Sequence, residues 1–142
     1  MARPLLKIAL HLAIGAWGIS LAGASQAQAG NAPPPATARK LTAAEEELLV
    51  AVESTWTDFV DKAARQDRRA LEHLAPGLRE AYARPSMFAA LTQIKSRQKD
   101  FGVTDIDKTW ARLASVLTSK GADHLQVVML EKRGGRWYIA AM

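Results

Sequence analysis

The strongest constraint on the fold of this chain is a one-sided apolar stripe between residues 42 and 63. Its apolar side chains recur at steps of three and four residues, and they are Leu49, Val52, Trp56, Phe59 or Val60, and Ala63. Charged residues fill the positions between them, as in a helix that buries one face and exposes the other. One helix cannot bury its own apolar face, so the rest of the domain must supply a surface that covers it.

Further helix signals flank this stripe. Thr42 with Glu45 has the spacing of a capping box, which predicts the start of the long helix. Asp67 can cap a second, short helix, and Pro76-Gly77 ends it. Residues 78–82 predict one more helical turn, and Pro85 opens a third helix that runs to Gly102. The apolar residues that these short helices bury are expected to be Ala70, Leu71, Leu74, Phe88, Leu91 and Ile94.

The end of the chain has the pattern of a β-hairpin. Two β-rich runs, residues 125–130 and 137–142, flank Gly134-Gly135, a favoured pair for a two-residue turn. Both faces of the hairpin are largely apolar, as in strands that are covered on each side. The expected facing pairs are Lys132 with Trp137, Leu130 with Ile139, Val128 with Ala141, Glu131 with Tyr138, Met129 with Ala140, and Val127 with Met142.

Residues 104–118 fit either a helix, which Gly121 would cap, or a strand. Because two strands alone make a marginal sheet, we favour a strand for the second half of this segment. Helices followed by an antiparallel sheet in the C-terminal third make an α+β domain, in which the N-terminal helices pack on the sheet.

The first 29 residues resemble a cleavable signal peptide. Arg3 and Lys7 precede an apolar run over residues 8–21, and Ala27-Gln28-Ala29 fits the small-x-small rule for cleavage. We expect cleavage after Ala29, or alternatively after Ala27, which would remove the apolar run from the mature chain. The run is also shorter than a helix that spans a bilayer, which disfavours an uncleaved membrane anchor. We therefore expect residues 1–29 to direct export to a bacterial periplasm or the outside, residues 30–40 to be a Pro-rich linker, and residues 41–142 to be one domain.

Composition limits the chemistry of the mature chain. The sequence has no cysteine, which excludes disulfides and thiolate metal sites. Removing residues 1–29 takes away Arg3 and Lys7, leaving 17 basic against 14 acidic side chains, a net charge of +3. This small, mixed charge predicts neither nucleic acid nor membrane as a partner.

The mature chain carries two histidines, His73 beside Glu72 and His124 beside Asp123. Adjacent side chains point in different directions, so neither pair makes a built-in dyad. We expect both histidines at the surface, with no catalytic residue, no metal site and no cofactor.

Three short motifs resemble the nuclear transport factor 2-like superfamily, the cystatin-like cone. They are the aromatic step from Trp56 to Phe59, the stretch from Gln66-Asp67 to Leu74-Ala75-Pro76, and Gly135-Arg136-Trp137-Tyr138-Ile139. The resemblance implies a curved antiparallel sheet over helices with a pocket in the cone. Superfamily members similar to ketosteroid isomerase use a tyrosine on the first helix and acids in the cavity. This chain has Trp56 and Phe59 on that helix, and Pro76-Gly77-Leu78 where an acid is expected.

The cone that the resemblance implies would be lined by aromatic side chains with tyrosines as polar groups. The predicted lining is Trp56, Tyr82, Phe88, Trp110, Trp137 and Tyr138. We therefore expect an exported binding or assembly module that holds an apolar small molecule or a protein partner, with a homodimer formed through the outer sheet face. The alternatives are an isomerase, dehydratase or hydrolase that uses ionisable groups in the same pocket, and an assembly subunit whose pocket is filled by its own side chains.

Overall fold

The computed structural model describes residues 40–142, and residues 41–142 form one compact unit. The predicted signal peptide and nearly all of the predicted linker lie outside the described residues. The elements follow in the order α1 (Ala43–Ala64), the 3-10 helix η1 (Arg68–His73), α2 (Pro76–Tyr82), α3 (Pro85–Thr92), α4 (Ile94–Arg97), β1 (Gln98–Ile106), β2 (Trp110–Ser119), β3 (Ala122–Arg133) and β4 (Arg136–Ala141).

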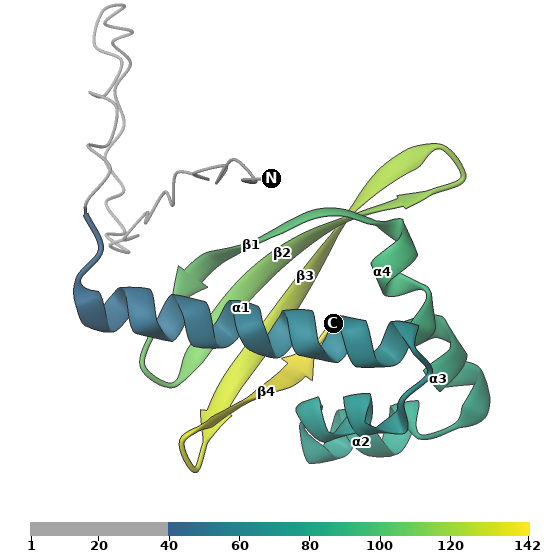
Figure 1. Cartoon of the computed structure of the whole chain (residues 1–142), viewed down its shortest axis with the longest axis horizontal. Helices are drawn as coiled ribbons and strands as arrows, with labels where there is room; N and C mark the ends of the chain where they lie inside the picture. The colour runs from purple at the N-terminus through teal and green to yellow at the C-terminus, as the bar shows by residue number, and fades with distance from the viewer. Residues whose placement is uncertain (1–39) are drawn as a thin grey trace, which may run out of the picture. The chain divides into compact units, whose positions relative to one another are not determined.

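The four strands form one antiparallel sheet in the order β1-β2-β3-β4. The sheet curves around α1, which crosses one of its faces, while α2, α3 and α4 gather near the C-terminal end of α1 (Figure 1). The predicted α+β class, with N-terminal helices packed on a curved C-terminal sheet, is confirmed.

Helix α1 begins as its sequence predicts. The Thr42 amide donates to Glu45 Oε2 at 2.8 Å, and the Glu45 amide donates to Thr42 Oγ1 at 3.3 Å, which completes the capping box. These bonds satisfy amides that the first turn of a helix leaves without partners. The buried residues of α1 all belong to the predicted stripe, and they are Val52, Trp56, Phe59, Val60 and Ala63. Leu49, also predicted in the stripe, is only partly buried and packs against this core.

The short second helix is a 3-10 helix rather than an α-helix. Asp67 caps η1 by accepting a hydrogen bond from the Arg69 amide at 3.0 Å, and Ala70, Leu71 and Leu74 are buried as predicted. This helix ends at His73, before the predicted end at Pro76-Gly77. Pro76 stands in the first turn of α2, where a missing amide costs nothing, and the helical turn predicted for residues 78–82 is part of α2.

The predicted third helix, residues 85–102, is divided at Gln93 into α3 and α4, and it is wrong in its last five residues. Helix α4 ends at Arg97, and the residues up to Gly102 belong to β1. In this strand Phe101 and Val103 face the core, and the strand pairs with β2 through Phe101↔Ser115 and Val103↔Leu113. Tertiary pairing therefore overrides the helical spacing that continues through this segment.

The favoured strand in residues 104–118 is confirmed as β2. Its hairpin with β3 turns at Lys120 and Gly121, which have φ of 52° and 78°. Gly121 is thus a turn residue and not the cap of a helix. Either role needs a positive φ, so the glycine by itself could not separate the two structures.

The C-terminal hairpin forms with Gly134 and Gly135 in its turn, at φ of 56° and 79°. The three predicted pairs nearest the turn are confirmed, namely Lys132↔Trp137, Glu131↔Tyr138 and Leu130↔Ile139. Beyond them the predicted register is wrong by one residue, since Met129 pairs with Ala141 and not with Ala140. Ala140 is the extra residue of a bulge, a feature that bends a strand and that a two-residue alternation cannot reveal.

One face of the sheet is packed against the helices. The most buried apolar side chains of this face are at most 5% exposed, and they are Val103, Ala111, Leu113, Val128, Leu130, Trp137 and Ile139. They form the core with the apolar stripe of α1. The free edge of β4 is covered in part, because Leu74 bridges to Ile139 and the Ala75 amide donates to the Ile139 carbonyl at 2.8 Å.

Candidate functional site

The six aromatic residues predicted to line a pocket divide between the two faces of the sheet. Trp56, Phe88 and Trp137 are part of the buried core, and Tyr82 packs against it. Trp110 and Tyr138 are half-buried on the opposite face of the sheet, because their strand neighbours Ala111, Trp137 and Ile139 point inward. Strand alternation therefore keeps these last two away from the other four.

A buried polar cluster lies between α1 and the sheet. Gln98 Oε1 accepts hydrogen bonds from Trp56 Nε1 at 2.9 Å and from Ser115 Oγ at 3.2 Å, and Ser115 is fully buried. The cluster gives the indole of Trp56 a partner inside the core, as a buried N–H requires. Because sequence reasoning placed Gln98 on a helix, it gave no sign of this contact.

A second cluster joins α1 to η1. Asp58 Oδ2 lies 2.7 Å from His73 Nε2 and 2.6 Å from Lys62 Nζ. His73 is only 8% exposed, so the prediction that it lies at the surface is wrong. Its partner is also not the adjacent Glu72, but a carboxylate on another helix.

The electrostatics of this cluster keep His73 neutral near pH 7. Burial lowers the pKa of His73, and this effect outweighs the opposing influence of Asp58. The hydrogen bond from Lys62 is the largest cause of the lowered pKa of Asp58. A neutral His73 that lies this close to a carboxylate must donate through Nε2, which leaves Nδ1 as the acceptor.

This histidine–carboxylate pair holds η1 against α1. The bond to Asp58 gives a hydrogen-bond partner to Nε2 of a nearly buried imidazole, and Lys62 Nζ lies 3.4 Å from the same nitrogen. Because its ring is nearly buried, His73 contributes to the packing of η1 against α1.

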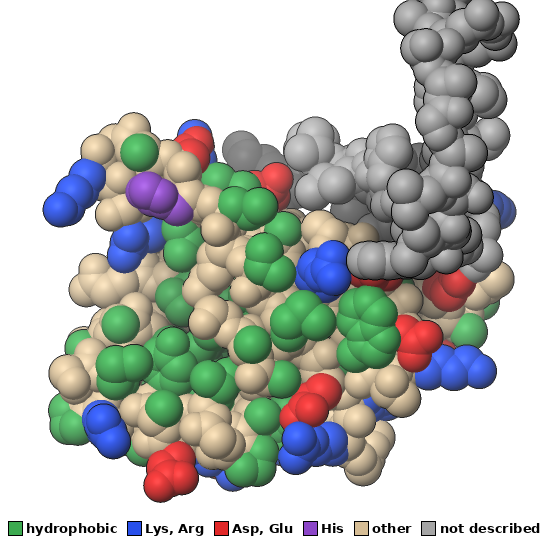
Figure 2. All heavy atoms as spheres, turned by 180° about the vertical axis from the view of Figure 1, so that it is seen from behind, with side chains coloured by type: hydrophobic (Ala, Val, Ile, Leu, Met, Phe, Trp, Pro, Cys, Tyr) green, Lys and Arg blue, Asp and Glu red, His purple; other side chains and the backbone are tan. Residues whose placement is uncertain are grey.

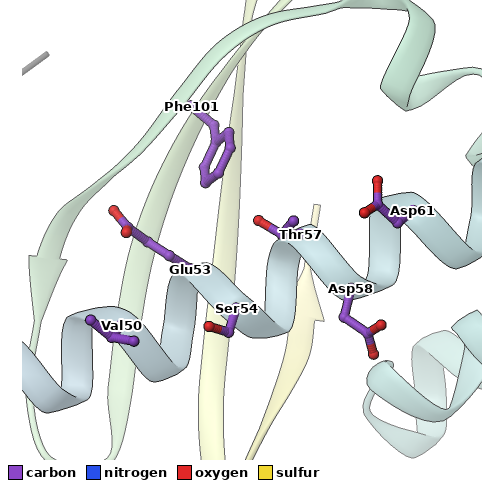
Figure 3. A pocket seen from close by; sticks show the side chains of 7 residues that line it. All are labelled: Val50, Glu53, Ser54, Thr57, Asp58, Asp61 and Phe101. Atoms are coloured by element: carbon purple, nitrogen blue, oxygen red, sulfur yellow. The ribbon is translucent and has the colours of Figure 1, made fainter. Parts of the chain in front are cut away.

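A groove lies on the solvent-facing side of α1, beside β1. It has a volume of about 430 Å³ and is lined by Val50, Glu53, Ser54, Thr57, Asp58, Asp61 and Phe101; we call it the α1–β1 groove. Figure 3 shows Glu53 extending toward the side where Phe101 lies, and Asp58 turned away from that ring. Only Phe101 comes from the sheet, so the groove could not be recognised while residues 98–102 were assigned to a helix.

The outer face of the sheet presents a third candidate surface. Leu125 is 68% exposed and Val127 is 47% exposed, both on β3. Their outward-facing neighbours on β2 and β3 include Ala114, Val116 and Met129, paired as Ala114↔Val127, Val116↔Leu125 and Arg112↔Met129. Figure 2, which views the molecule from behind α1, shows hydrophobic side chains gathered over this side. We call Ala114, Val116, Leu125, Val127 and Met129 the outer apolar patch.

Two other features are absent from residues 40–142. This part of the chain holds no group of three or more His, Cys, Asp or Glu side chains arranged to bind a metal ion. None of its helices is long and apolar enough to cross a membrane.

No family model matches the chain, and no curated protein matches it. Among solved structures it is similar to a crystal structure from Campylobacter jejuni described as an NTF2-like transpeptidase. The two sequences are 13% identical, and the match covers 64% of this chain and 98% of the other, with a TM-score of 0.45. The observed order of helices before an antiparallel sheet is the order that the resemblance of the sequence motifs implies.

Proposed function

We propose that the mature chain is an exported, non-enzymatic assembly module that pairs with a second copy of itself through the outer apolar patch. The observation that carries the proposal is the exposure of Leu125 and Val127 on β3, one of the two central strands of the sheet. Soluble monomers rarely expose a contiguous apolar patch of this kind unless another surface covers it.

A second copy is the occupant that this surface fits best. The patch lies on β2 and β3, away from both edges of the sheet, and charges of both signs border it at Arg112 and Glu131. A twofold axis places the same surface on both partners, so opposite charges on one face can meet across it. The apolar strip then packs on its own copy, as in sheets that stack face to face.

The interior gives less support to a ligand held within the cone. Trp56 is fully buried, and Phe88 and Trp137 are nearly so, in contact with the core. Side chains that fill the space beneath a sheet stabilise the fold but leave no room there for a ligand. A partner would then bind at the surface of the domain.

Export is supported by the sequence alone. The basic start, the short apolar run and Ala27-Gln28-Ala29 favour removal of residues 1–29. We therefore propose a periplasmic or secreted location for the domain.

Sedimentation velocity of the mature chain from Gly30, over a range of concentrations, tests the proposed pairing. We expect a dimer, and we expect Val127→Glu to dissociate it because the variant places a charge within the apolar patch. Met87→Glu is the matched control, since Met87 is an exposed apolar residue on α3, away from the patch.

Two results would overturn the proposal. One is a wild-type chain that sediments as a monomer at every concentration it tolerates. The other is native mass spectrometry of the purified chain that shows a monomer carrying a small molecule, which would favour the ligand-binding alternative.

A further inference from the structure

We propose that the α1–β1 groove binds an arginine or lysine side chain of an apolar peptide segment from a partner protein, with Glu53 as its counter-ion. This surface differs from the outer apolar patch, because six of its seven lining residues lie on α1.

The groove is built by the periodicity of one helix. Its α1 residues lie at positions 50, 53, 54, 57, 58 and 61, the three- and four-residue steps of a single helix face. The twelve residues of helix from position 50 to position 61 extend over about 16 Å, enough for several residues of an extended peptide. Phe101 of β1 forms the opposite wall (Figure 3).

The charges of the groove select a cation. Three carboxylates and no lysine or arginine line it. Asp58 is bound by Lys62, and Asp61 lies 2.8 Å from Lys95 Nζ. For Glu53 the described residues supply no hydrogen bond or ion pair, and burial raises its pKa. A partly desolvated carboxylate without a cation gains from one that a ligand brings.

The apolar part of the groove selects a cation with a carbon stem. Val50 is 60% exposed, and the half-buried ring of Phe101 lines the same groove. Lysine and arginine side chains lay their methylene groups on such surfaces, and their charged ends are attracted to an aromatic face. A metal ion would leave both of these apolar groups without a contact.

Strand β1, beside the groove, has features that disfavour the pairing of a peptide strand with its free edge. The amide of Phe101 donates to Asp100 Oδ1 at 2.9 Å, and β1 has register shifts on both sides of residues 100–103. Bulges and charges of this kind prevent an edge strand from accepting another strand. The occupant is therefore held by its side chains and does not extend the sheet.

An NMR titration of the mature chain tests the proposal. The probe is a capped hexapeptide of alternating leucine and arginine. We expect saturable amide shifts at Glu53 and Phe101. We expect Glu53→Gln to weaken binding about fivefold, the upper range for a partly exposed ion pair. Glu47→Gln, an exposed carboxylate on the same helix outside the groove, is the matched control and should bind as the wild type does.

Two further arms separate the contributions to binding. A peptide with glutamate in place of arginine should not bind, and one with glycine in place of leucine should bind more weakly. Val127→Glu should leave the titration unchanged, so failure of the proposed pairing and failure of the groove are distinguishable.

Several outcomes would overturn the proposal: equal affinity of Glu53→Gln and wild type, shifts that map to the outer apolar patch, or no saturable shift.

Residues 41–142 form a compact unit, so a chain that starts at residue 40 can also be measured. Tighter binding by this shorter chain would indicate that residues 30–39, which include Arg39, compete with the peptide for the groove. The occupant would then be the chain's own linker and not a partner protein.

Discussion

The two faces of the sheet are built from the same strands but have different surroundings. On β3, Val128 is fully buried beneath α1 and its neighbours, whereas Val127 beside it is 47% exposed. Both faces are rich in apolar side chains, and within the described residues the helices cover only one of them. The comparison shows that apolar character in a strand predicts burial only where a covering element exists.

Because of this difference, we expect the inner face to determine the stability of the fold and the outer face to determine association. The inner face and the stripe of α1 supply the core, so changes there should affect folding. The outer apolar patch adds little to the folded monomer, so changes there should affect association instead.

The largest effect is expected at Trp56. Replacing it with alanine empties the centre of the core and removes the donor to Gln98 Oε1. We expect the free energy of unfolding to fall by about 3–5 kcal/mol, as for other buried tryptophans. Chemical denaturation monitored by circular dichroism measures this loss. A loss below about 1 kcal/mol would show that Trp56 does not anchor the core.

Adjacent valines on β3 give the matched comparison of the two faces. Val128→Ala removes two buried methyl groups and should cost about 2 kcal/mol. Val127→Ala makes the same chemical change on the outer face, and should cost less than about 0.5 kcal/mol in the monomer. Denaturation at low protein concentration measures both variants without a contribution from pairing. Equal losses at the two positions would contradict the division between the faces.

A smaller, pH-dependent effect is expected at His73, on the helical side of the core. Its folded pKa is lowered from the ordinary value of 6.5, mainly by burial, while Asp58, Lys62 and Arg136 also act on it. The unfolded chain therefore binds a proton at His73 more readily than the folded chain. This contribution to stability is complete above pH 6.5 and is lost as the pH falls below that value.

Denaturation between pH 7.5 and 5 checks this dependence. His73→Gln keeps a donor for Asp58 but does not titrate, so the fall in stability with acid should become shallower. The lowered pKa of Asp58 acts at more acidic pH, below its ordinary value of 3.8, and does not interfere. An equally steep fall in the variant would show that other groups cause the dependence.

Local signals predicted part of the fold well. The capping box at Thr42, the stripe of α1 and the turn at Gly134-Gly135 each depend on residues close in sequence, and each is confirmed. Strand β1 was missed because its register shifts interrupt the alternation that identifies a strand. The bulge at Ala140 likewise interrupts the two-residue alternation of β4, so the predicted pairs beyond it are wrong by one residue.

The candidate sites were harder to predict than the fold. His73 and Asp58 are separated by 15 positions and by a change of helix type, so no short motif joins them. The α1–β1 groove depends on Phe101, which lay in the misassigned segment. The apolar character of the outer face was visible in the hairpin sequence, but its exposure depends on where the helices pack.

The most direct test of the central claim, that a second copy covers the outer face, is the rate of thiol labelling at single cysteines. The natural chain has none, so Val127→Cys and Met87→Cys each introduce one reactive position. As protein concentration rises, labelling at position 127 should slow while labelling at position 87 stays constant. Equal rates at position 127 across all concentrations would contradict the account.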